Sequence, residues 1–150
     1  MSYLIGVVLA LSSAVLAKAI KFDRRTFYAS VLIVSATYYV LFAVMAGSAH
    51  AMIVESAVMT TFVLFAGVSA RVNPWLIVVG FAAHGTLDLV HGTLISNPGV
   101  PVWWPPFCMM YDVVASVVYA RAIERSSRSS FRKTVLQLAR RKYQDARPVL

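Results

Sequence analysis

Six ionisable side chains lie within, or at the ends of, long apolar segments of this chain. They are three histidines and three carboxylic acids: His50, Glu55, His84, Asp88, His91 and Asp112. An ionisable group in hydrocarbon costs roughly 2.5–3.5 kcal/mol on insertion scales, so it usually faces a cavity, a partner or a metal ion. We therefore interpret these residues as a candidate site.

The spacing of His84, Asp88 and His91 indicates what such a site would bind. Positions i, i+4 and i+7 share one narrow stripe of a helix, and no lysine or arginine occurs between residues 72 and 120. Imidazole and carboxylate together suit zinc, iron or manganese. We predict a divalent transition-metal site held by His84, Asp88 and His91, with Glu55 and Asp112 as ligands from neighbouring helices. A metal-free hydrogen-bonded network is the competing interpretation.

The same side chains are the candidates for catalysis. A metal with a free coordination position would activate water or oxygen. Without a metal, His84 or Asp88 would carry the proton in acid–base chemistry, with Glu55 and Asp112 beside them. His50 lies in a short turn, where a surface histidine is more common than a ligand.

Composition identifies the class of protein. Hydrophobic residues make up 59% of the 150 residues and charged residues only 13%, and the mean hydropathy is +0.72. A soluble domain of this size would expose too much apolar surface, which indicates an integral membrane protein. We predict an all-α polytopic bundle of five transmembrane helices, because five apolar stretches each have about 17–25 residues. They are residues 3–19, 27–46, 51–70, 75–95 and 107–123.

Charge predicts the orientation of the bundle. All 14 lysines and arginines fall in the first connection, the third connection or the tail. These segments share one side of a five-span topology, so the positive-inside rule makes that side cytoplasmic and places the N-terminus outside. A rise of about 1.5 Å per residue then puts Glu55, Asp88, His91 and Asp112 at one depth in the outer half of the membrane.

Residues 124–150 form a basic cytoplasmic tail that follows the bundle of residues 1–123. Phe131, Val135 and Leu138 recur at helical spacing among basic residues, which is typical of an amphipathic helix on anionic membrane lipids. A solvated tail that only sets the topology is an equal alternative. We expect no nucleic-acid partner, because no recognised binding module accompanies the charge.

Aromatic residues near the outer boundary have simpler interpretations. Trp103 and Trp104 are typical of an interfacial aromatic belt, with a substrate entrance as the alternative. Tyr38 and Tyr39 are interpreted as donors of helix-packing hydrogen bonds, although either phenol could instead donate to a carboxylate.

The stretch His84-Gly-Thr-Leu-Asp88-Leu-Val-His91, followed by a Pro-rich turn, Cys108 and Asp112, resembles a small integral-membrane family of bacteria and fungi. The function of that family is unknown, and the resemblance covers roughly a quarter of this chain. The pattern departs from the family at Gly92, where a second histidine is expected. The resemblance implies that the five named residues form one constellation, in what we expect to be a bacterial inner (plasma) membrane protein.

These observations favour a membrane-embedded metal-dependent enzyme that acts on a lipid or another apolar small molecule. One alternative is a metal-free acid–base isomerase of a sterol-like substrate, by a loose analogy of architecture and residue types. Another is a small proton or divalent-cation transporter or channel subunit, which would assemble as a homo-oligomer to enclose a path. A structural accessory subunit is the fourth interpretation.

Overall fold

The structure is a computed structural model that describes the backbone of residues 1–145 and the side chains of residues 1–141. Over these residues the chain forms five α-helices, each with a stretch long and apolar enough to cross a membrane. The prediction of an all-α chain with five such helices is confirmed, while the orientation stays a prediction. The helices are α1 (Ser2–Ala19), α2 (Arg24–Met45), α3 (Ala49–Arg71), α4 (Pro74–Leu94) and α5 (Trp104–Asp145).

Polar residues just outside the apolar stretches set where the helices begin. The Asp23 carboxylate accepts hydrogen bonds of 2.8 Å from the Thr26 amide and hydroxyl at the start of α2. These two hydrogen bonds hold the pKa of the Asp23 carboxyl below its usual range, and the bond from the Thr26 main-chain amide has the larger effect. Ser48 and Asn73 accept from the first turns of α3 and α4 in the same way. These three helices therefore begin one to three residues before their apolar stretches, as capping side chains favour.

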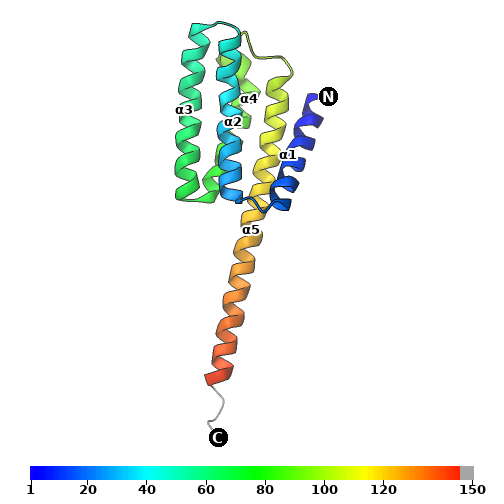
Figure 1. Cartoon of the computed structure of the whole chain (residues 1–150), viewed down its shortest axis with the longest axis vertical. Helices are drawn as coiled ribbons and strands as arrows, with labels where there is room; N and C mark the ends of the chain where they lie inside the picture. The colour runs from blue at the N-terminus through cyan, green and yellow to red at the C-terminus, as the bar shows by residue number, and fades with distance from the viewer. Residues whose placement is uncertain (146–150) are drawn as a thin grey trace. The chain divides into compact units, whose positions relative to one another are not determined.

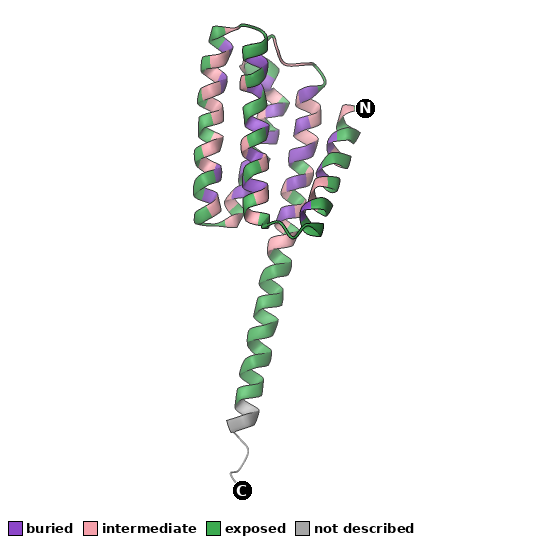
Figure 2. Ribbon diagram, in the orientation of Figure 1, coloured by how far each residue is buried: buried purple, intermediate pink, exposed green. Residues whose placement is uncertain are grey.

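Residues Met1–Ala120 form one compact unit, in which the helices run up and down. The connections α1–α2 and α3–α4 lie at one end of this unit, and α2–α3 and α4–α5 lie at the other (Figure 1). Buried residues occupy the faces that these helices turn toward one another (Figure 2). The outward faces carry exposed apolar side chains such as Leu4, Leu64 and Leu89. Apolar surface of this extent fits contact with lipid.

Close contact between α1 and α5 depends on a glycine. A Cβ atom added at Gly6 would clash with the main-chain oxygen of Phe107, so a larger residue would push the two helices apart. A hydrogen bond of 2.9 Å between the hydroxyls of Ser13 and Tyr111 joins the same pair of helices. Small residues and interhelical hydrogen bonds of this kind are what hold helices together in lipid.

The last helix is longer than the apolar stretch within it. The sequence places the end of the fifth span near residue 123, but α5 continues to Asp145. Leu, Gln, Arg and Lys favour helix, and neither glycine nor proline occurs between residues 107 and 145. A second compact unit begins at Arg121, and within it Phe131 and Leu138 are exposed on helical backbone. Binding of this tail to lipid stays a prediction.

Candidate functional site

Four side chains with metal-ligand chemistry converge between α4 and α5. His84 and Asp88 are four residues apart on α4, and Cys108 and Asp112 are four residues apart on α5. All four are buried, and one ligand atom from each lies within 4.8 Å of the others. The i, i+4 spacing puts both side chains of each helix on one face, so two facing pairs make one cluster.

Hydrogen bonds fix the orientation of this cluster. Nδ1 of His84 lies 2.6 Å from Oδ2 of Asp112 and 3.5 Å from Oδ2 of Asp88. On the other side of Asp88, the hydroxyl of Tyr39 donates a 2.6 Å hydrogen bond to Oδ1. The imidazole therefore faces two carboxylates, and α2 supplies the support for one of them.

Two oxygens of the cluster are left without partners. Oδ2 of Asp88 and Oδ1 of Asp112 are buried and have no hydrogen-bond partner among the described residues. Buried polar groups are normally paired, and a buried charge needs a counter-ion or a proton. Residues 72–120, which include this part of α4 and α5, contain no lysine or arginine that could serve as the counter-ion. The cluster thus has acceptor capacity that a cation or protons must satisfy.

A second polar group lies nearer the α4–α5 connection. Nε2 of His91 is 2.8 Å from Oε1 of Glu55 on α3, and both side chains are buried. The side-chain amide nitrogen of Asn97, Nδ2, donates to the same Oε1 at 2.9 Å and to the main-chain oxygen of Tyr39 at 3.0 Å. This group ties the connection to α2, α3 and α4.

Tyr39 links the two groups. Its ring stacks on the His91 imidazole with centroids 4.2 Å apart, while its hydroxyl binds Asp88. One tyrosine on α2 therefore contacts the histidine–glutamate pair with its face and the four-residue cluster with its tip.

The structure divides the residues that the sequence had grouped. His84, Asp88 and Asp112 come together, whereas His91 and Glu55 pair with each other. His50 is exposed. The division has a simple cause, because seven residues of helix separate His84 from His91 by about 10 Å along the axis. A shared stripe does not bring such side chains to one ion.

Several residues that matter here were given other roles from the sequence. Asn97 is not among the candidates from the sequence, because it lies in a connection three residues after the end of α4, where no repeating pattern marks a contact. Tyr39 donates to a carboxylate, which was the less favoured interpretation. Trp104 was assigned to an interfacial belt with Trp103, but Trp104 is buried and packs edge-on against Phe42 at 5.0 Å.

Comparisons of this chain with family models, curated proteins and solved structures found no match. The resemblance to a small bacterial and fungal membrane family therefore stays a prediction. Functional inference for this chain consequently depends on the chemistry of the site.

Proposed function

We propose that the protein is a membrane-embedded metal-dependent enzyme that acts on a lipid or another apolar small molecule. The proposal depends chiefly on the convergence of His84, Asp88, Cys108 and Asp112 within 4.8 Å in a buried position. Three protein ligands and one open position are the usual arrangement of a catalytic zinc site. The four candidate ligands of this cluster are therefore one more than such a site requires.

Charge and hydrogen bonding support a cation at this place. Two ionised carboxylates beside a single imidazole, with no lysine or arginine among residues 72–120, would be very unfavourable in a medium of low dielectric constant. A divalent ion would balance both charges, and it would also bind the two carboxylate oxygens that lack partners. A proton shared between His84 and Asp112 would satisfy only that one contact.

The donor set narrows the choice of metal. A thiolate and an imidazole favour zinc or iron, whereas manganese prefers oxygen ligands. Of the three metals that the sequence indicates, zinc and iron therefore fit the cluster better because it contains Cys108. Such a metal would polarise a carbonyl or activate a bound water molecule for attack on the substrate.

The test is the metal content of the detergent-purified protein and of matched variants. We expect close to one zinc or iron per chain in the wild type, and loss of that metal in His84→Ala and Asp112→Asn. His91→Ala and the exposed His50→Ala should keep it, because neither side chain belongs to the cluster. Thermal unfolding of each sample shows whether the variant remains folded. A folded wild type without metal, even after supply of zinc and iron, would overturn the proposal.

One observation favours a second candidate, acid–base catalysis without a metal. The 2.6 Å contact between His84 and Asp112 and the 2.6 Å bond from Tyr39 to Asp88 hold two acids beside one base. Such an arrangement could move a proton on a sterol-like substrate, in the way that positioned side chains do in isomerases. A metal-free wild type that isomerises a sterol would favour this function.

A further inference from the structure

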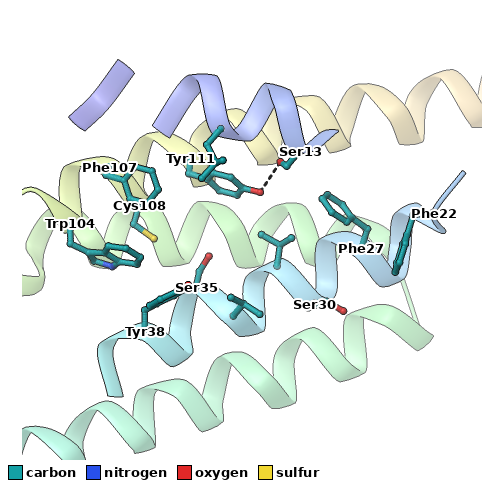
Figure 3. A pocket seen from close by; sticks show the side chains of 13 residues that line it. Ser13, Phe22, Phe27, Ser30, Ser35, Tyr38, Trp104, Phe107, Cys108 and Tyr111 are labelled. Carbon is teal, nitrogen blue, oxygen red and sulfur yellow. Dashed lines mark hydrogen bonds between the residues drawn. The ribbon is translucent and has the colours of Figure 1, made fainter. Parts of the chain in front are cut away.

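A cavity of about 490 Å³ lies among α1, α2 and α5 and shares Cys108 with the four-residue cluster. Phe22 and Phe27 line one part of this cavity, and Trp104 and Phe107 line another. Figure 3 shows their rings around a space that is bordered mainly by carbon. Cavities of this volume and lining are typical of sites for apolar small molecules.

Cys108 connects the cavity to the cluster. Its side chain lines the cavity, and its sulfur is one of the four ligand atoms that lie within 4.8 Å of one another. Opposite it, the largely buried hydroxyl-bearing side chain of Ser35 lines the cavity from α2 (Figure 3). A molecule in the cavity would therefore lie directly beside the candidate metal ligands.

Ser35 gives the cavity a polar group beside Cys108. The side chain is 8% exposed and lines the cavity, and its hydroxyl has no hydrogen-bond partner among the described residues. A buried hydroxyl usually has a partner. An oxygen atom of a bound molecule would supply one at the end of the cavity where Cys108 also lies.

The cavity is long compared with its volume. On α2 its lining extends from Phe27 to Tyr38, which is about 16 Å along the helix axis. That length is about half of a hydrocarbon core of roughly 30 Å. The hydroxyls of Ser13 and Tyr111 in the lining are hydrogen-bonded to each other, and the Ser35 hydroxyl lies near the Cys108 end. This long, mostly apolar space therefore matches a straight hydrocarbon chain that carries oxygen at one end.

We propose that this cavity binds one fatty acyl chain, with its carboxyl or ester oxygen near Ser35 and Cys108 and its methyl end toward Phe22 and Phe27. The acyl chain would also identify the substrate of the proposed enzyme, and only that further step rests on the proposed function. Binding of the chain does not require the metal.

The experiment uses the full-length protein in detergent and palmitic acid with a diazirine group in mid-chain. Photolysis should label residues of the cavity, Val31 above all, and unlabelled palmitic acid should reduce that labelling at least fivefold. Cholesterol at the same concentration should not reduce the labelling. Labelling spread evenly over the outward faces of the helices, or stronger competition by cholesterol, would overturn the proposal.

Three variants sharpen the result. Val31→Trp fills the cavity and should abolish the specific labelling, whereas Leu41→Trp, at an exposed position of α2 outside the cavity, should leave it intact. Ser35→Ala keeps a small side chain but removes the hydroxyl, so the concentration of palmitic acid needed to compete should rise several-fold. The concentration of hexadecane needed should not change, because hexadecane has no oxygen. Equal labelling of Val31→Trp and Leu41→Trp would contradict the assignment.

Metal content in the same samples separates this proposal from the proposed function. Val31→Trp should lose labelling and keep its metal, and His84→Ala should lose its metal and keep its labelling. Specific labelling of a metal-free wild type would support the acyl-chain site while overturning the metalloenzyme. A metal-loaded wild type without specific labelling would support the metal site and overturn the acyl-chain site.

Discussion

The phenol of Tyr39 on α2 donates a 2.6 Å hydrogen bond to Oδ1 of Asp88 on α4. This bond occupies one carboxylate oxygen and leaves the other, Oδ2, 3.5 Å from Nδ1 of His84. The orientation of Asp88 is thus set from a helix that contributes none of the four candidate ligands. Loss of a group that orients a metal ligand typically lowers metal affinity about 10- to 100-fold.

Replacement of Tyr39 by phenylalanine tests this positioning role. We expect the free energy of unfolding to fall by about 0.6 to 1.7 kcal/mol, the range measured for interhelical hydrogen bonds in membranes. Metal affinity should fall about 10-fold or more. Tyr38→Phe is the matched control, because no hydrogen bond from the Tyr38 hydroxyl occurs among the described residues. Equal effects in thermal unfolding and metal titration of the two variants would refute the role.

Two glycines near the α4–α5 connection should respond in opposite ways to alanine. A Cβ atom at Gly99 would clash with the main-chain oxygen of Phe42, so Gly99→Ala should destabilise the bundle by about 1–3 kcal/mol, as overpacking does. A Cβ at Gly92 meets nothing within 4 Å. Gly92→Ala should be neutral or stabilising by up to about 1 kcal/mol, because alanine favours helix. Unfolding in detergent and denaturant measures both, and a stable Gly99→Ala variant would contradict the packing.

Metal retention should depend on pH if the cluster is a metal site. Protons compete with a metal for imidazole, thiolate and carboxylate ligands, so the metal should be kept at neutral pH and released on acidification. We expect release between about pH 7 and pH 5, where free imidazole becomes protonated. Elemental analysis after dialysis at each pH gives the curve. His50→Ala should give the same curve, and a His50-dependent midpoint would point to metal bound at the surface instead.

Cysteine labelling tests the predicted orientation. Val102 is 94% exposed in the α4–α5 connection, and Lys21 lies in the α1–α2 connection at the opposite end (Figure 1). Val102→Cys should react with a membrane-impermeant thiol reagent on intact cells, whereas Lys21→Cys should react only after lysis. The native Cys108 is buried and should stay unlabelled in both. Reaction of Lys21→Cys on intact cells would reverse the topology and place the cluster in the other half of the membrane.

The helices were the predictable part of this fold. Apolar stretches of membrane length determine where the chain is helical, and Ser48, Asn73 and Pro74 mark helix starts that can be read directly from the sequence. The sequence offers a helix in the tail as one of two alternatives, but it does not predict that this helix continues α5 without a break, because hydropathy reports where a membrane span ends and not where a helix ends. Helix propensity alone argues for the longer helix, since no breaker occurs before Asp145.

The composition of the site was predictable only in part. The side chains of His84 and Asp88 are adjacent on any helix, so their pairing required no tertiary information. The association of Asp112 with His84, and of Glu55 with His91, depends on which helices are neighbours and on how each is rotated. Sequence spacing does not contain that information for a single chain. The role of Asn97 was equally hidden, because it arises from the path of a connection rather than from a repeating pattern.

If the five apolar helices insert into a membrane, the distribution of polar partners along the chain has a consequence for the order of assembly. Helices are made in order from the N-terminus, and a polar residue that enters the bilayer alone is unfavourable. When α4 enters, Tyr39 on α2 is already present for Asp88, and Glu55 on α3 is present for His91. Asp112, the closest partner of His84, lies on α5, which is synthesised last together with Cys108. In a chain inserted in this order the four-residue cluster stays half built until the final helix joins, so a metal held by both helices would be acquired at or after that step.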